Sequence, residues 1–343
     1  PLPAAVGCLI SRSQVLTLIG RTDDALAASH EAIALAAMCE DRRLTADCLG
    51  QVSNIHNATS RYRELSRTAR RCLVLCQAIG YPRGIAASYA YLGLALDNDG
   101  KYHQAIDCYA RSAELRQATG DEEGYAICLE DIATSHFAMG EYREAETLYR
   151  RALAASERAG SICVQSHLLQ CLASVQLQRA QYREALGLLS QALAINMRVG
   201  DRSSEAYTLH EIGYVHHALG DDAKAMEYLR ESELIKEQTG ELWSQACSLN
   251  QLARICVENG MVDTAAQYLD KGDRIAAAVR SVDVSSRLAV ARAELSLAGG
   301  DIEKAAEATE RAMGLADQAK LRARRAEAVL LWARINAARG NHT

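Results

Sequence analysis

The sequence contains few of the residues that interrupt helices or build aromatic cores. Only three of its 343 residues are prolines, Pro1, Pro3 and Pro82, so no proline interrupts a helical pattern beyond Pro82. Aromatic residues make up 5%, with a single phenylalanine, and no strand-like alternation of apolar and polar residues occurs. Apolar residues still make up 49%, and alanine, the best helix former, is abundant among them. This composition predicts an all-α protein.

The chain also lacks the charge of a nucleic-acid-binding protein and the apolar runs of a membrane protein. Its net charge is −5, and the densest basic run, Arg322, Arg324 and Arg325, is interpreted as a solvated helix face. No apolar run reaches the roughly 18 residues of a membrane span, and no signal peptide is recognised. We therefore expect a soluble, cytoplasmic protein with no direct nucleic-acid contact and no membrane contact.

Catalytic and cofactor motifs are missing as well. No G-x-x-x-x-G-K-[ST], G-x-G-x-x-G or G-x-S-x-G motif occurs, so neither a phosphate-binding loop nor a nucleophile elbow is predicted. His210 and Glu211 begin like the H-E-x-x-H zinc helix, but Tyr214 replaces the second histidine. We expect no catalytic residue, no cofactor and no metal. A metal-dependent enzyme centred on His210 and Glu211 is the least favoured alternative.

A forty-residue period organises what is present. Starting from Gly140, a glycine or small residue returns at each step, as Gly20, Ser60, Gly100, Ala180, Gly220, Gly260, Gly300 and Gly340. Five residues after each of these points stands Ala25, Ala105, Ala145, Ala185, Ala225, Ala265 or Ala305, with Leu65 as the one departure. A period of this length indicates stacked repeats, each burying its apolar face against the next.

Each unit contains two amphipathic helical patterns. The first carries a large apolar column at i and i+3, as in Leu129 and Ile132, followed at once by a small residue such as Ala133. This spacing predicts a buried stripe, and the small column predicts where a neighbouring helix comes closest. The units are expected as one continuous array over 1–343, with repeats at about 4–40, 41–80, 81–120, 121–160, 161–200, 201–240, 241–280 and 281–320 and a capping helix at 322–338. The alternative that the chain is a piece of a longer multidomain protein stays open.

Turn chemistry supports these boundaries. Glycines stand where a helix end favours a left-handed residue, and Asp or Ser follows where the next helix would be capped. The glycines are Gly120, Gly160, Gly200 and Gly240, and the capping residues are Asp121, Ser161, Asp201 and Ser281. Short connections of this kind predict antiparallel helix pairs.

Eleven cysteines, an odd number without a C-x-x-C pair, give no metal or redox signature. Cys72 aligns with Ala152 and Ala192, and Cys256 aligns with Ser296, so these thiols occupy small-residue columns. We interpret them as small hydrophobic residues in a reducing compartment.

The pattern resembles the tetratricopeptide repeat. The unit at 121–160 matches the signature positions with Leu129, Ile132, Ala133, Ala145, Tyr149 and Ala152. It departs in having Glu157 in place of the usual proline and a period of forty in place of about thirty-four. Long repeats of this kind are similar to those of Pins-type adaptors, kinesin light chains and bacterial tetratricopeptide regulators. The resemblance implies an all-α, right-handed superhelical solenoid of about eight helix-turn-helix repeats with a C-terminal capping helix.

A second, polar stripe on the first helices is the candidate binding surface, because the resemblance implies that these positions line a concave groove. Its residues are Asn54, Asn57, Asn98, Glu130, Thr134, His167, Gln170, Tyr207, His210, Tyr214, His217, Asn250 and Arg254. Amides, histidines and tyrosines suit the recognition of a peptide.

We therefore predict a non-enzymatic interaction scaffold that binds a peptide segment of a protein partner in this groove. Such a scaffold would serve as the regulatory arm of a larger signalling or transcription-control protein. The alternative is a small-molecule or signal-peptide sensor domain of a bacterial regulator. A compact pocket at one end of the groove would favour the sensor, and a continuous open groove would favour the scaffold.

Overall fold

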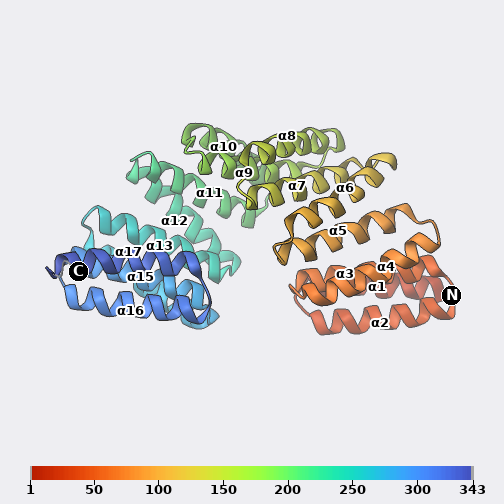
Figure 1. The fold of residues 1–343 in the computed structure, drawn as a ribbon, viewed down its shortest axis with the longest axis horizontal. Coiled ribbons are helices and arrows are strands. Elements are labelled where there is room, and N and C mark those ends of the chain that lie inside the picture. The colour runs from red at the N-terminus through yellow and green to blue at the C-terminus, as the bar shows by residue number, and fades with distance from the viewer. Residues whose placement is uncertain (1, 341–343) are drawn as a thin grey trace. The chain divides into compact units, whose positions relative to one another are not determined.

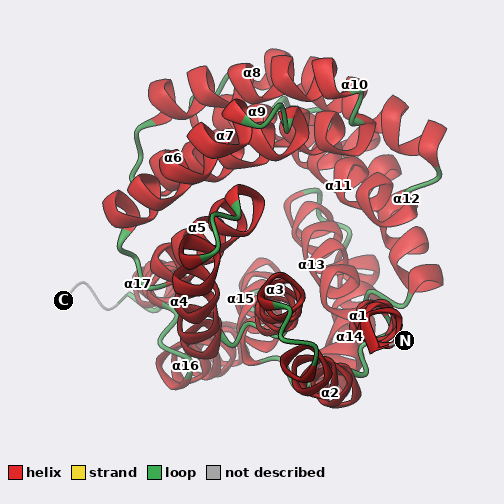
Figure 2. Ribbon diagram, turned by 90° about the vertical axis from the view of Figure 1, so that its right-hand side faces the viewer, coloured by secondary structure: helices red, strands yellow, loops and turns green. Residues whose placement is uncertain are grey.

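The computed structural model describes residues 2–340, and 17 α-helices make up almost all of this range (Figure 1). They are α1 (Leu2–Leu18), α2 (Thr22–Met38), α3 (Arg42–Ala58), α4 (Tyr62–Ala78), α5 (Pro82–Asn98), α6 (Tyr102–Ala118), α7 (Glu122–Ala138), α8 (Tyr142–Ala159), α9 (Ile162–Gln178), α10 (Tyr182–Val199), α11 (Arg202–Ala218), α12 (Asp222–Thr239), α13 (Leu242–Glu258), α14 (Val262–Val279), α15 (Val282–Ala298), α16 (Ile302–Gln318) and α17 (Arg322–Ala338). Short loops join them, and no strand occurs within the described range (Figure 2). The predicted all-α helical repeat fold is confirmed. Residues 1 and 341–343 of the predicted array lie outside the description.

The helices fall into two compact units. Unit 1 ends at Gln178 and unit 2 begins at Arg179, so the chain passes from one to the other inside the repeat expected at 161–200. The single continuous array over 1–343 stays a prediction. Odd-numbered helices are the first helices of the repeats and even-numbered helices are the second.

The two small-residue columns are buried, as their persistence predicts. All seven alanines of the constant column, and Leu65 in the same position, have an exposed fraction of 0%. Gly93 and Gly213 mark close helix approaches, because a Cβ on Gly93 would lie 2.6 Å from the Tyr109 ring and one on Gly213 would lie 2.7 Å from Leu229 Cγ. The helices within each unit therefore pack at distances that only small side chains permit.

The turns use the predicted backbone conformation. Gly120, Gly160, Gly200 and Gly240 have φ between 69° and 74°, the left-handed region. Non-glycine residues adopt it at five equivalent positions, with φ between 52° and 57°: Glu40, Ser60, Ala180, Arg280 and Lys320. Side chains then cap the following helices, where Asp121 accepts from the Gly124 amide, Asp201 from the Ser204 amide and Ser281 from the Val284 amide.

The first helices form the inner layer of each unit. In unit 1 each of α1, α3, α5 and α7 contacts the next first helix, and α11, α13 and α15 do so in unit 2. No second helix of the described range makes a comparable contact with the next second helix. The repeats are therefore spaced more tightly along the first helices. Residues of the polar stripe lie on this layer.

Five cysteines are buried, and all eleven are free thiols. The buried ones are Cys48, Cys72, Cys76, Cys128 and Cys256. None of the described helices is both long enough and apolar enough to cross a membrane.

Candidate functional site

Ten of the thirteen polar-stripe residues fall in three columns on the inner layer, spaced i, i+3 and i+7 along each first helix, and Asn57, Asn98 and His217 follow the third column by three or four residues. The first column contains residues 127, 167, 207, 247, 287 and 327, the second contains 130, 170, 210 and 250, and the third contains 54, 134, 214, 254 and 294. Unit 1 holds Asn54, Asn57, Asn98, Glu130, Thr134, His167 and Gln170, and unit 2 holds Tyr207, His210, Tyr214, His217, Asn250 and Arg254.

In unit 1 the first and third columns are open to solvent. Asn54, Thr134 and His167 are exposed, and so is Asn98 at the C-terminal end of α5, whereas Asn57 is half-buried. Two of these side chains have polar partners. The His167 Nδ1 lies 2.9 Å from the Glu130 carboxylate, and the Thr134 and Tyr149 hydroxyls lie 2.9 Å apart.

The second column differs from the expectation, because it turns toward the neighbouring helices. Gln170 is only 7% exposed, and His210 points its Nδ1 at the buried Ser248 hydroxyl, 3.0 Å away. Burial, followed by the charge of Lys236, lowers the pKa of His210 to about 3, so its ring is neutral. Gln170 is therefore mostly enclosed, His210 is half-buried, and their assignment to the groove stays a prediction. The Asn250 Oδ1 is also buried, and it has no hydrogen-bond partner.

His210 and Glu211 are neighbours on α11, but their side chains point in different directions. Successive residues of a helix point about 100° apart, and burial raises the pKa of Glu211, which favours its neutral form. Within the described residues they belong to no group of three donors that could hold an ion. The metal-enzyme alternative stays an untested hypothesis.

Tyr207 and Tyr214 are two exposed aromatic residues of unit 2, and Trp243 of α13 is a third. The two tyrosines lie seven residues apart on α11, at 46% and 43% exposure, so both rings are on the same face of the helix. Farther along the helix, His217 contacts the Asp222 carboxylate at 2.7 Å. Tyrosine is one of the residue types enriched among those that contribute most to the binding of a protein partner.

A polar cleft of about 550 Å³ lies in unit 1. It is bordered by α1, α3 and the first half of α5, together with Arg116 of α6. Asn54 is the one predicted residue that lines it, beside Asp47, Gln51, Arg83 and Tyr91. A volume of this order is typical of small-molecule and short-peptide sites.

Small side chains in the inner columns create this cleft. Gly50 stands at the second-column position that Glu130 occupies two repeats later, and Ala87 stands where the first column carries His167. Both line the cleft. Two repeats later the same positions carry the larger side chains of Glu130 and His167.

Arg116 contributes a positive charge to the cleft. Its guanidinium lies 3.5 Å from the Asp121 carboxylate, and its Nε is buried without a hydrogen-bond partner. A Cβ on Gly124 would overlap this guanidinium, so the glycine makes room for it. An anionic group in the cleft would meet an arginine that is only partly neutralised.

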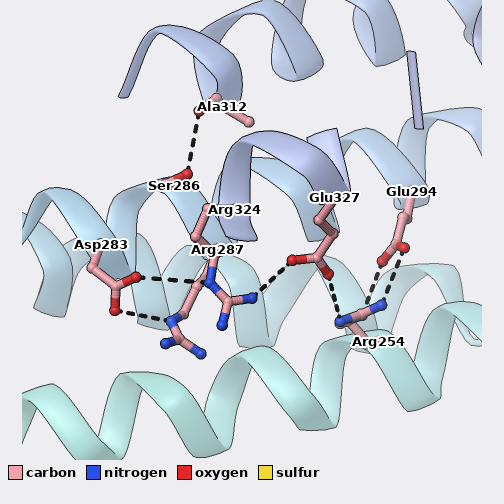
Figure 3. Close-up of polar contacts among 8 residues, drawn as sticks. All are labelled: Arg254, Asp283, Ser286, Arg287, Glu294, Ala312, Arg324 and Glu327. Carbon is pink, nitrogen blue, oxygen red and sulfur yellow. Dashed lines mark hydrogen bonds and ion pairs between the residues drawn. The ribbon is translucent and has the colours of Figure 1, made fainter. Parts of the chain in front are cut away.

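In unit 2 the inner layer carries a chain of ion pairs that joins α13, α15 and α17 (Figure 3). Arg254 binds two carboxylates at once, Glu294 at 3.2 Å and Glu327 at 3.1 Å. The network continues from Glu327 to Arg324 at 2.8 Å and from Arg324 to Asp283 at 3.8 Å, and Asp283 also binds Arg287 at 3.0 Å. Arg254 is therefore held by acids of two later helices.

The two acidic partners of Arg254 were not predicted from the sequence, although the forty-residue period contains part of the signal. Glu294 follows Arg254 by forty residues, and Glu327 follows Arg287 by forty, so opposite charges succeed each other within one column. Continuing the third column beyond Arg254 finds Glu294, and continuing the first column beyond Arg287 finds Glu327.

Comparison with known proteins agrees with the repeat architecture. The sequence profile of the tetratricopeptide repeat family matches residues 84–158 and 164–238, and the two matches begin eighty residues apart, two structural repeats. The chain is a tetratricopeptide-like repeat protein. The long-repeat resemblance inferred from the unit at 121–160 is thereby confirmed, since both matches consist of such units.

Solved structures share the fold of this tetratricopeptide-like protein at low sequence identity. A Rap protein crystallised with competence and sporulation factor is 16% identical, with a TM-score of 0.64, over 99% of this chain and 98% of its own. Aspartyl phosphate phosphatase F from Bacillus subtilis is 17% identical, with a TM-score of 0.62, over 97% and 94%. A STAND protein with a tetratricopeptide repeat sensor from Pyrococcus horikoshii is 16% identical, with a TM-score of 0.62, over 92% of this chain and 50% of its own. No curated protein sequence matches the chain.

Proposed function

We propose that this tetratricopeptide-like protein is a non-enzymatic scaffold that binds a peptide segment of a protein partner on its inner layer. The observation that carries the proposal is the exposure of first- and third-column side chains in each unit, which include Asn54, Thr134, His167, Tyr207 and Tyr214. Amide, hydroxyl and imidazole groups can pair with peptide backbone, and the two tyrosines supply apolar contact area.

The Rap protein similar in fold was crystallised with competence and sporulation factor, which supports a regulatory role for an array of this kind. We extend the proposal to the regulatory arm of a larger signalling or transcription-control protein. Eleven free thiols, five of them buried, favour the reducing cytoplasm.

A pull-down with a paired control tests the scaffold. A Tyr207→Ala and Tyr214→Ala variant removes exposed rings, so it should keep the parent's helical circular dichroism and lose the partner that the parent recovers. A control variant of exposed second-helix residues, Glu144→Ala and Glu184→Ala, should retain that partner. Loss of the partner by the control alone would place the working surface on the second helices.

A sensor function is the second candidate, and the cleft of unit 1 favours it. The cleft combines a compact volume with an arginine that has a buried, unpaired Nε, which suits a small ligand or short peptide bearing an anionic group. Asn54→Ala with Arg83→Ala should then abolish protection of the chain against heat by its ligand, while Tyr207→Ala with Tyr214→Ala should leave that protection intact. The reverse outcome would favour the scaffold over the sensor.

A further inference from the structure

Three potential metal donors from two successive repeats meet on the inner layer of unit 1. Glu130 lies on α7, and His167 and Cys171 lie four residues apart on one face of α9. Their ligand atoms all lie within 4.8 Å of one another, and the His167 Nδ1 is 2.9 Å from Glu130 Oε1. No other group of three histidine, cysteine or acidic donors in the described part of the chain has this geometry.

The donor set is the one that zinc prefers. An imidazole nitrogen, a thiolate sulfur and a carboxylate oxygen are each common zinc ligands, and three protein ligands leave a fourth tetrahedral position open. The side chains of the cluster differ in their exposure to solvent. The His167 side chain is 59% exposed and that of Glu130 is 16% exposed, so an ion can enter from the solvent side while the carboxylate remains mostly enclosed.

A further carboxylate lies beside the cluster, because Asp131 follows Glu130 on α7. A divalent ion bound to Cys171 would take the place of the thiol proton, which passes to solvent.

Hydrogen bonds of Tyr149, which is not itself a proposed ligand, orient the Cys171 sulfur. The Tyr149 hydroxyl interacts with Cys171 and lies 2.9 Å from the Thr134 hydroxyl. Tyr149 is 3% exposed, so its position is fixed by packing. Partners of this kind hold a metal ligand in its binding geometry.

We propose that Glu130, His167 and Cys171 form a zinc site whose fourth position opens to solvent on the inner layer. Because its ligands come from α7 and α9, the ion would link two successive repeats of unit 1. The zinc site requires no protein partner, although His167 is also among the exposed side chains of the peptide-binding proposal.

Metal titration of the full chain tests the site. Zn²⁺ should bind in one equivalent by isothermal titration calorimetry, and Co²⁺ should give the near-ultraviolet charge-transfer band of a cobalt–thiolate bond. His167→Ala and Cys171→Ser should each weaken Zn²⁺ binding by more than about tenfold, because even outer partners of a metal ligand contribute roughly 10–100-fold. Cys171→Ser should abolish the cobalt band.

A matched control uses His136→Ala with Cys247→Ser, a histidine and a half-buried cysteine outside the cluster. It should keep both the Zn²⁺ affinity and the cobalt band. Zn²⁺ should also raise the melting temperature of the parent and of this control, but not of His167→Ala, whose exposed side chain can be removed without disturbing the core. Absence of a cobalt band in the parent, or its persistence in Cys171→Ser, would overturn the site. If Cys171→Ser does not fold, unchanged Zn²⁺ affinity in His167→Ala overturns it alone.

Discussion

The Lys236 ammonium lies 2.9 Å from the Ser248 hydroxyl, in the interface between two successive repeats of unit 2. Lys236 is 3% exposed, and the same hydroxyl is the partner of His210. Burial lowers the pKa of Lys236 to about 8. An equivalent pair, Asn196 and Thr208, lies 3.0 Å apart in the preceding interface of this unit.

The pKa of Lys236 gives unit 2 a pH-dependent stability. Between pH 8 and 10.5 the unfolded chain holds a proton on this lysine that the folded chain has lost, so the free energy of unfolding rises with pH. The rise is about 1.4 kcal/mol per pH unit and about 3 kcal/mol in total. Lys236→Met should abolish it and should be more stable than the parent at pH 7 by about 1–3 kcal/mol. Urea unfolding of both proteins at several pH values measures the difference, and equal slopes would contradict the assignment.

Non-glycine residues at the left-handed turn positions are strained, and replacement by glycine should relieve this strain. Arg280→Gly or Lys320→Gly should stabilise the chain by up to about 1 kcal/mol, because a Cβ is unfavourable at φ of 52° or 57°. Gly200→Ala should destabilise it by a similar amount. The same change at Gly187 is the control, since this glycine lies inside helix α10 with open space around it and alanine should stabilise it by about 0.5–1 kcal/mol. Thermal melting distinguishes these signs.

Overpacking tests the constant alanine column. Ala145→Leu places three further carbons where the exposed fraction is 0%, so it should lower stability by about 1–3 kcal/mol. Ala154→Leu changes an exposed alanine of the same helix and should stay within about 0.5 kcal/mol of the parent. Equal melting temperatures for the two variants would show that the column is not a packing constraint.

The ion-pair chain of unit 2 predicts non-additive mutations. Arg254→Met leaves Glu294 and Glu327 without their shared cation, and burial already raises the pKa of Glu294. The single variant should therefore lose about 1–2 kcal/mol, discounted for partial exposure of the network. Replacing all three residues by methionine should recover most of this loss. A triple variant as unstable as the sum of its single variants would show that the three charges act independently.

The fold could be predicted because its signals recur every forty residues. Ala145 and its equivalents predict a buried helix contact in each repeat, and these positions are buried. Gly140 and its equivalents predict a turn in each repeat. The membership of each column could also be predicted. The exposure of each side chain in a column could not. Gln170 and Thr134 are both polar, but Gln170 is buried and Thr134 is exposed.

Features that depend on two or more repeats were missed for the same physical reason. The cleft is produced by the small size of Gly50 and Ala87. Neither residue carries a polar side chain that would identify a site in the sequence. The pairing of Arg254 with Glu327 joins residues 73 positions apart on two helices that are not consecutive in the chain. Cys171 becomes a candidate metal ligand only because α9 places it beside Glu130 of the preceding repeat.

The polar pairs between repeats of unit 2 also determine which repeats can be neighbours. Removal of residues 241–280 would join Gly240 to Ser281 with the turn and the helix cap unchanged, but it would place Leu288 where Lys236 now meets Ser248. In the native interface Leu288 packs in one core with Ala276, which occupies the position equivalent to Lys236. The repeats therefore share a backbone but are not interchangeable, and the order in which they succeed one another is encoded side chain by side chain.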